Sequence, residues 1–221
     1  MKLKKIASLA LAGIMAVSML AGCKDGGNTG DNDDTVVVPV TGIVEYANDA
    51  LDELKDDLSF AGNSWLDGKL NDLATSVGNL PANAIGDAYD DNTDAAKTYT
   101  KLQEKLQSAL TEDGKIVVNN SSVFGDNPDS TNSRTWADVY LVSGRMDQES
   151  AIKAVIAEVE SILTDAKVVA NVDIDKTTYS CEYAGEISAL KVTNKSLTGE
   201  SAWVVAVVVE QSFAKASNDV I

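Results

Sequence analysis

The sequence contains no histidine among its 221 residues. Without an imidazole, Ser-His-Asp and Cys-His catalytic systems cannot form, and neither can the histidine-ligated zinc and iron sites of many extracytoplasmic enzymes. The phosphate-binding loops GxxxxGK[ST] and GxGxxG are also absent, which argues against nucleotide-dependent activity. Paired carboxylates or a Ser-Lys pair remain open, but no pattern singles out any of the 34 acidic residues. We therefore expect no enzyme, metal or cofactor, with a carboxylate-based hydrolase as the less favoured alternative.

Basic residues are few: 18 Lys and Arg stand against 34 Asp and Glu, a net charge of −16. A surface of this charge repels nucleic acid and anionic lipid headgroups, so we expect no nucleic-acid partner. The partners least disfavoured are neutral molecules, cations and basic proteins. The simpler interpretation, which we favour, is that the acidity keeps a surface protein soluble.

Cysteine is also scarce, with Cys23 and Cys181 the two in the chain. Cys23 follows a basic start, MKLKK, and an uncharged apolar run from residue 6 to residue 20. A positive start and a short apolar stretch are typical of a secretory signal peptide, and the stretch is shorter than the roughly 20 apolar residues of a membrane-spanning helix. Residues 1–22 are therefore expected to be a targeting segment.

The residues around Cys23, Leu20-Ala21-Gly22-Cys23, resemble the lipobox of bacterial lipoproteins. The resemblance implies that a diacylglyceryl group alkylates the Cys23 thiol, that residues 1–22 are removed, and that Cys23 becomes the N-terminus. Loss of three lysines would leave 15 basic against 34 acidic residues, a net charge of −19. Two acyl chains anchor a protein stably without spanning the membrane. The alternative is an ordinary secretory peptide that has a cysteine by chance.

Residues 23–35 contain Gly, Asn and Asp and nothing apolar to bury, so we expect a lipidated cysteine followed by a flexible tether. Twelve residues reach at most about 40 Å when stretched. If Cys23 is lipidated, Cys181 has no partner for an intrachain disulfide. Its alternating surroundings, TTYSCEY, place it as a small apolar residue on the buried side of a strand, with a reactive thiol as the alternative.

Residues 36–221 are expected to be globular, with a helical part at about 42–112. Apolar residues spaced by three and four predict amphipathic helices over 42–58, over 66–80 as far as Pro81, and from an Asp94 cap to a left-handed turn at Gly114.

The strand-rich part covers about 115–213. A helix over 148–166, capped by Asp147, has the clearest apolar stripe in the chain. The run from Ala202 to Val209 is apolar on both alternating faces, which predicts a central strand. Short connectors at 175–176 and 184–185 indicate antiparallel neighbours. The predicted strands cover residues 115–119, 136–143, 167–174, 177–183, 187–193 and 202–213. The fold class is therefore α+β, with about three N-terminal amphipathic helices followed by a mainly antiparallel sheet packed by a further helix.

The best candidate for ligand binding is the segment SRTWADVYLVSGRMD. Arg134 and Arg145, the two arginines of the chain, flank a strand that carries Trp136 and Tyr140. In an acidic protein this arrangement would make a local site for an anionic or sugar-like ligand, with Trp136 as a stacking surface. We favour the simpler interpretation, in which each arginine pairs with a nearby acid and Trp136 lies in the core.

The strongest sequence signals concern display on a membrane. We therefore expect a membrane-anchored, non-catalytic interaction or binding module of the cell envelope, on the outer face of the bacterial cytoplasmic membrane or the cell surface. Its partner would be an envelope protein or a cell-wall component. The alternative is a small-ligand receptor or a transport-accessory lipoprotein, and a pocket in the folded region would favour it.

Overall fold

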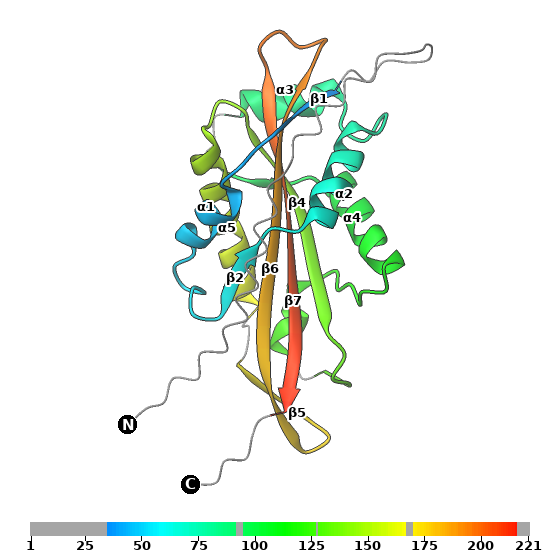
Figure 1. The fold of residues 1–221 in the computed structure, drawn as a ribbon, viewed down its shortest axis with the longest axis vertical. Helices are drawn as coiled ribbons and strands as arrows, with labels where there is room; N and C mark the ends of the chain where they lie inside the picture. The colour runs from blue at the N-terminus through cyan, green and yellow to red at the C-terminus, as the bar shows by residue number, and fades with distance from the viewer. Residues whose placement is uncertain (1–34, 92–94, 127, 167–169, 216–221) are drawn as a thin grey trace. The chain divides into compact units, whose positions relative to one another are not determined.

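The apolar run near the end of the sequence forms the central strand of the fold. The computed structural model describes residues 35–91, 95–126, 128–166 and 170–215. Strand β7 (Ser201–Lys215) lies between β6 (Thr177–Asn194) and β4 (Arg134–Ser143), antiparallel to both (Figure 1). Every residue from 201 to 209 is buried, as a strand covered on both faces requires.

Shorter strands complete a seven-stranded sheet with the order β1-β6-β7-β4-β3. Along the outer edge of β6 lie β5 (Asn171–Ile174), β2 (Leu58–Ala61) and β1 (Thr35–Pro39), of which β2 is parallel to β6. On the other side, β3 (Lys97–Thr98) pairs with β4. The α+β class and the mainly antiparallel sheet are thus confirmed.

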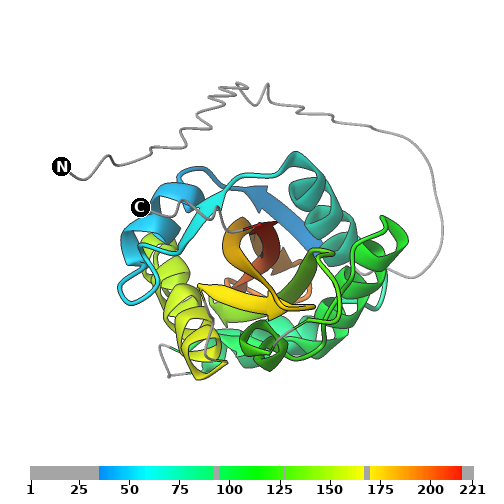
Figure 2. The ribbon, with the colours of Figure 1, turned by 90° about the horizontal axis from the view of Figure 1, so that it is seen from below.

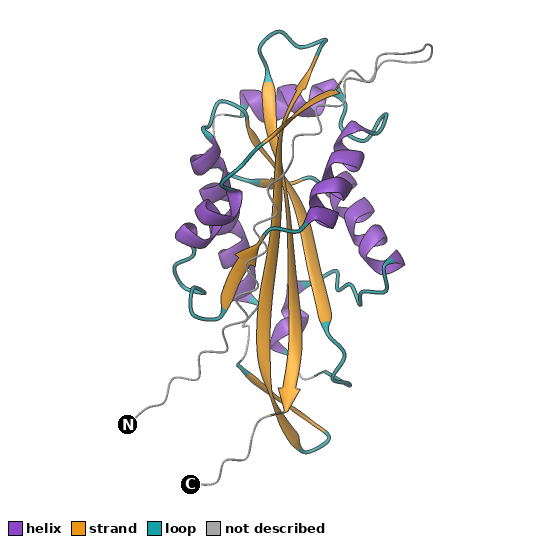
Figure 3. Ribbon diagram, in the orientation of Figure 1, coloured by secondary structure: helices purple, strands orange, loops and turns teal. Residues whose placement is uncertain are grey.

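Five α-helices cover the two faces of this sheet (Figures 1–3). They are α1 (Ile43–Ala50), α2 (Ser64–Thr75), α3 (Ala82–Asp90), α4 (Thr100–Glu112) and α5 (Gln148–Asp165). Alternate β7 residues, such as Val205 and Val207, join a core with α1 and α5, and those between them, such as Val204 and Ala206, join a second core with α2, α3 and α4. All these elements belong to one compact unit.

Helix α5 confirms the clearest sequence prediction. The Asp147 carboxylate accepts hydrogen bonds from the Ser150 N–H and hydroxyl, both at 2.9 Å, and so caps the first turn. The apolar stripe of the helix is buried against the sheet: Ile152, Val155, Ile156, Val159 and Leu163. Periodicity and cap residue agree here, which is why the boundaries were predictable.

Before β4, the described residues form four helices, where the sequence predicted about three. The helix predicted over 42–58 ends at Ala50, although Leu51 and Leu54 are still buried. Beyond Ala50 the backbone N–H groups of Asp52 and Leu54 donate to the Glu160 carboxylate of α5, at 2.9 and 3.0 Å. The chain can therefore leave the helix at Ala50 while these two backbone N–H groups still have hydrogen-bond acceptors.

The prediction for Pro81 was wrong, because α2 ends earlier and Pro81 begins another helix. Helix α2 stops at Thr75, and Pro81 is the N-cap of α3. Proline suits a helix start because the first N–H groups of a helix have no intrahelical partner. Asp94 lies outside the described residues, and the N-cap of α4 is Tyr99 instead. Gly114 has the expected left-handed conformation, with φ +83°.

Two strand predictions also need correction. Residues 115–119 form no strand, and only Val117 makes an isolated bridge, to Thr135. No turn occurs at Ala184–Gly185, since β6 is continuous there. Gly185 instead allows a close approach of β2, because a Cβ on it would lie 2.5 Å from Cδ1 of Phe60.

The turn predicted at Asp175–Lys176 is confirmed. Both residues have positive φ, 48° and 64°, as the tight turn of a two-residue hairpin requires.

Side chains close part of the outer edge of β4. The Gln107 amide of α4 donates to the Ala137 carbonyl at 2.9 Å, and the Val139 N–H donates to the Asp138 carboxylate at 2.7 Å. These bonds satisfy backbone groups that no strand reaches. Within the described residues, no helix combines the length and the apolar character needed to cross a membrane.

We predict that Gly185→Ala lowers the free energy of unfolding by about 1 to 3 kcal/mol, because β2 and Phe60 must shift to admit the methyl group. Urea denaturation measures the loss. Gly68→Ala is the matched control, because Gly68 is inside α2 and a Cβ added there would meet no atom within 4 Å beyond its chain neighbours and the backbone of its own helix. That change should stabilise by about 0.5 to 1 kcal/mol. Equal effects at both positions would contradict the close approach at Gly185.

Candidate functional site

The four residues proposed from the sequence do not come together. Arg134 begins β4 and Arg145 follows its end, with the full length of the strand between them. Trp136 and Tyr140 are 4% and 0% exposed and lie in the core beneath α5. Neither aromatic ring is available as a stacking surface for a ligand.

Arg134 supports the local structure at its end of β4. Its guanidinium donates to Oε1 of the buried Gln211 at 3.0 and 2.6 Å and lies 5.5 Å from the centre of the Phe213 ring. The Gln211 amide in turn donates to the Phe124 carbonyl and the Tyr183 hydroxyl. Arg134 thus contacts an amide in place of the expected acidic side chain.

Arg145 fastens α3 to the opposite end of β4. Its guanidinium pairs with Asp90 at 3.2 Å and lies 4.3 Å from the centre of the Tyr89 ring. This acid partner agrees with the simpler interpretation of Arg145. The Ser143 hydroxyl donates to the Tyr89 carbonyl at 3.1 Å, so three contacts hold α3 beside this end of the strand.

Cys181 is a free, half-buried residue on β6, opposite Phe213 on β7. Burial raises the pKa of its thiol, and the nearby Arg134 only partly opposes this effect. A raised pKa reduces the thiolate fraction and with it the reactivity of the thiol.

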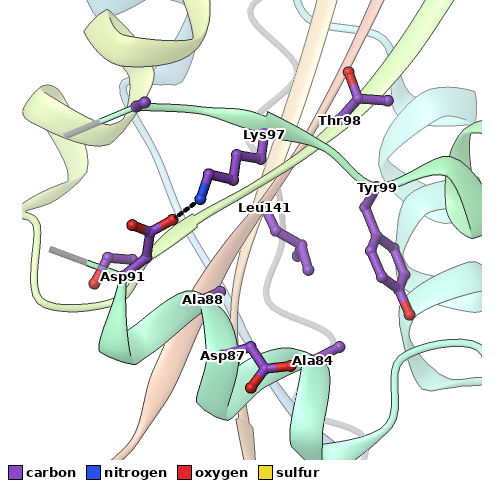
Figure 4. A pocket seen from close by; sticks show the side chains of 10 residues that line it. Ala84, Asp87, Ala88, Asp91, Lys97, Thr98, Tyr99 and Leu141 are labelled. Carbon is purple, nitrogen blue, oxygen red and sulfur yellow. Dashed lines mark ion pairs between the residues drawn. The ribbon is translucent and has the colours of Figure 1, made fainter. Parts of the chain in front are cut away.

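A pocket of about 280 Å³ lies where α3 faces β3 and the end of β4 (Figure 4). Ala84 and Ala88 of α3 and Leu141 of β4 provide apolar surface, and the small alanine side chains leave the space open. Its lining comprises Ala84, Asp87, Ala88, Asp91, Ala95, Lys97, Thr98, Tyr99, Leu141 and Ser143. Apolar surface with a few polar groups is typical of small-ligand sites.

The charged groups of the pocket come from α3 and β3. Asp91 and Lys97 form an ion pair, in which the Asp91 side chain is 18% exposed and that of Lys97 is 65% exposed (Figure 4). Asp87 lies one turn before Asp91 and is exposed. Its carboxylate makes no hydrogen bond or ion pair with any described residue. The pocket therefore contains a carboxylate that the fold leaves unengaged.

Tyr99 closes one side of the pocket. Its hydroxyl donates to the Asn79 carbonyl at 3.1 Å and so points away from Asp91 and Lys97 (Figure 4). Burial raises the pKa of this phenol, which keeps it a hydrogen-bond donor at neutral pH. The ring, held by this bond, presents apolar surface to the pocket.

Behind the pocket, Thr98 connects to a buried carboxylate. The Thr98 hydroxyl donates to Asp138 at 2.8 Å, and Asp138 is 3% exposed. Burial raises the pKa of Asp138, the negative charge of Glu158 adds to the rise, and the bonds from Thr98 and Val139 partly offset it. Burial also raises the pKa of the neighbouring Tyr140, with a further contribution from the Asp138 charge. The bond from Thr98 links β3 to the edge of β4.

Sequence reasoning missed this pocket because it treated no residue of α3 as helical. Ala84, Asp87, Ala88 and Asp91 are spaced by three and four, which places them on one helix face after Pro81. That spacing was the available signal. The approach of β3 and Leu141 had no sequence signal, because it is a tertiary contact.

No cluster of three or more potential metal-ligating side chains occurs in the part of the chain that the structure describes. Comparison of the chain with known protein families, with curated protein sequences and with solved structures found no match.

The buried Asp138 should make the free energy of unfolding depend on pH. Its pKa is raised above the ordinary value of 3.8, so its contribution to stability is present below pH 3.8 and is lost as the pH rises through the folded-state pKa. An asparagine can accept the Val139 N–H at its amide oxygen and donate its NH2 group to the Thr98 hydroxyl oxygen, without burying a charge. We expect the free energy of unfolding of Asp138→Asn, relative to that of the wild type, to increase from pH 3.5 to pH 7. Urea denaturation of both proteins at each pH measures this difference. A difference that stays constant over this pH range would contradict a raised pKa of Asp138 in the folded protein.

Proposed function

We propose that this chain is an extracytoplasmic bacterial lipoprotein, anchored through Cys23, whose folded unit is a non-catalytic binding module. Its ligand is a small molecule held in the pocket between α3 and the β3–β4 edge. The observation that carries this proposal is the pocket itself, with apolar surface from α3 and β4 and charges at Asp87, Asp91 and Lys97. Such a pocket favours the small-ligand receptor over a purely protein-binding module.

The pocket lies at the end of the sheet where the described chain enters the fold. The described chain enters the fold at Thr35, which pairs with Asn194 at one end of β6. Ser143, which lines the pocket, pairs with Ala202 at the start of β7, next to the same end of the sheet.

The chemistry of the buried groups supports a non-catalytic role. Asp138, the carboxylate with the raised pKa, accepts bonds from Thr98 and Val139 and is nearly inaccessible. Arg134 and Arg145 are engaged in contacts within the fold. These groups act in positioning strands and helices.

Ligand binding can be tested by thermal shift on the chain starting at Lys24, which retains the whole compact unit. The compounds are sugars, amino acids, amines and small anions. A ligand at 100 times its dissociation constant adds about 2.7 kcal/mol and should raise the Tm by several degrees. Ala88→Leu fills the pocket and should abolish the shift, whereas Ala82→Leu, on the same helix but outside the lining, should keep it. A shift that survives Ala88→Leu, or a flat screen on folded protein, would count against the pocket.

The anchor is tested separately in cells fed an alkyne-labelled fatty acid. The wild-type chain should incorporate the label and remain in the membrane fraction, because two acyl chains give stable anchoring. Cys23→Ala should lose the label. Cys181→Ala, which removes the other cysteine, should keep it. Labelling of the Cys23→Ala chain would contradict lipidation at this residue.

A further inference from the structure

The charged groups that line the pocket do not balance. Asp87 and Asp91 contribute two negative charges and Lys97 one positive charge, and the Lys97 ammonium is paired with Asp91. The remaining charge belongs to Asp87, whose carboxylate has no hydrogen bond or ion pair with a described residue. The charge that would complete the site is therefore a single positive one.

The apolar surface of the pocket narrows the kind of cation. Ala84, Ala88 and Leu141 and the ring of Tyr99 offer no ligand atoms to a metal ion. Hard divalent cations need six or more oxygen ligands, or several waters in their place. An organic cation uses both features, because its ammonium can contact Asp87 while its hydrocarbon part covers the apolar residues.

The electrostatics of the whole chain act in the same direction. A net charge of −16 favours the approach of cations and opposes that of anions. Lys97 is 65% exposed, so its charge is well solvated and screens Asp87 only weakly.

We propose that the pocket binds a small organic amine, with its ammonium at the Asp87 carboxylate and its hydrocarbon part against Ala84, Ala88 and Leu141. The inference rests on the proposed function, since it names the ligand chemistry of the same pocket. Asp87 is then the residue that determines specificity for charge. A lysine side chain carries the same aminoalkyl group, so the test must separate a free amine from a peptide.

The experiment is isothermal titration calorimetry on the chain starting at Lys24 with three probes of equal length: pentylamine, pentanol and pentanoate. We expect pentylamine to bind about tenfold or more tightly than pentanol, and pentanoate not to bind. Raising the salt concentration should weaken binding of the amine alone, because Asp87 is exposed. The peptide Gly-Lys-Gly is titrated as a fourth probe, and we expect it to bind more weakly than pentylamine.

Asp87→Asn should weaken the binding of pentylamine about tenfold and leave the binding of pentanol unchanged, because the substitution removes the charge and keeps the shape of the side chain. Asp72→Asn is the matched control, with the same charge change at an exposed position of α2 outside the pocket lining. Asp72→Asn should change the affinity for neither probe. The Tm of each variant without ligand establishes that both are folded.

The outcomes separate this inference from the proposed function. If the thermal-shift screen finds a ligand whose binding Ala88→Leu blocks, yet pentylamine does not bind, the pocket is confirmed as a binding site and the inference of an amine ligand is wrong. Pentylamine binding that Asp87→Asn leaves intact would overturn the role of Asp87. Tighter binding of Gly-Lys-Gly than of pentylamine would replace the free amine with a peptide as the ligand. If no probe binds and the screen is flat, both proposals fail.

Discussion

The antiparallel pairing of β6 with β7 is the interaction on which the rest of the structure depends. It extends from Tyr179 opposite Lys215 to Thr193 opposite Ser201. Strands β1, β2 and β5 pair with the outer edge of β6, β4 pairs with the outer edge of β7, and β3 joins the sheet through β4. The five helices of the described chain pack on the two faces. Because β7 is apolar on both faces, each helical layer finds a surface to pack on. Loss of this pairing would separate the two cores from each other.

Sequence periodicity predicted the elements that are long and packed in a uniform way. Helix α5, strand β4 and strand β7 each keep a single pattern over many residues, so local and tertiary preferences agree. The short strands β1, β2 and β3 have no such pattern, because their pairing depends on neighbours distant in the sequence. Gly185 was taken for a turn because a glycine in a strand has the same sequence signal whether the chain turns or another strand approaches closely.

The candidate site shows the same limit. Arg134, Trp136, Tyr140 and Arg145 were grouped because they are close in the sequence, but a strand of ten residues carries its ends far apart. The pocket residues come instead from α3, β3 and the end of β4. Only the spacing of Ala84, Asp87, Ala88 and Asp91 was visible in the sequence. Their apposition to Lys97 and Leu141 depends on the pairing of β3 with β4.

The central strand β7 is also the last of the described strands in sequence order, and this order affects when the sheet can form. Until β7 is in place, β4 and β6 lack the neighbour that joins them, and both helical layers lack the strand on whose faces they pack. Native pairing of strands distant in sequence is slow, because the intervening chain must first be brought together. Both cores can therefore close only when β7 pairs with β4 and β6.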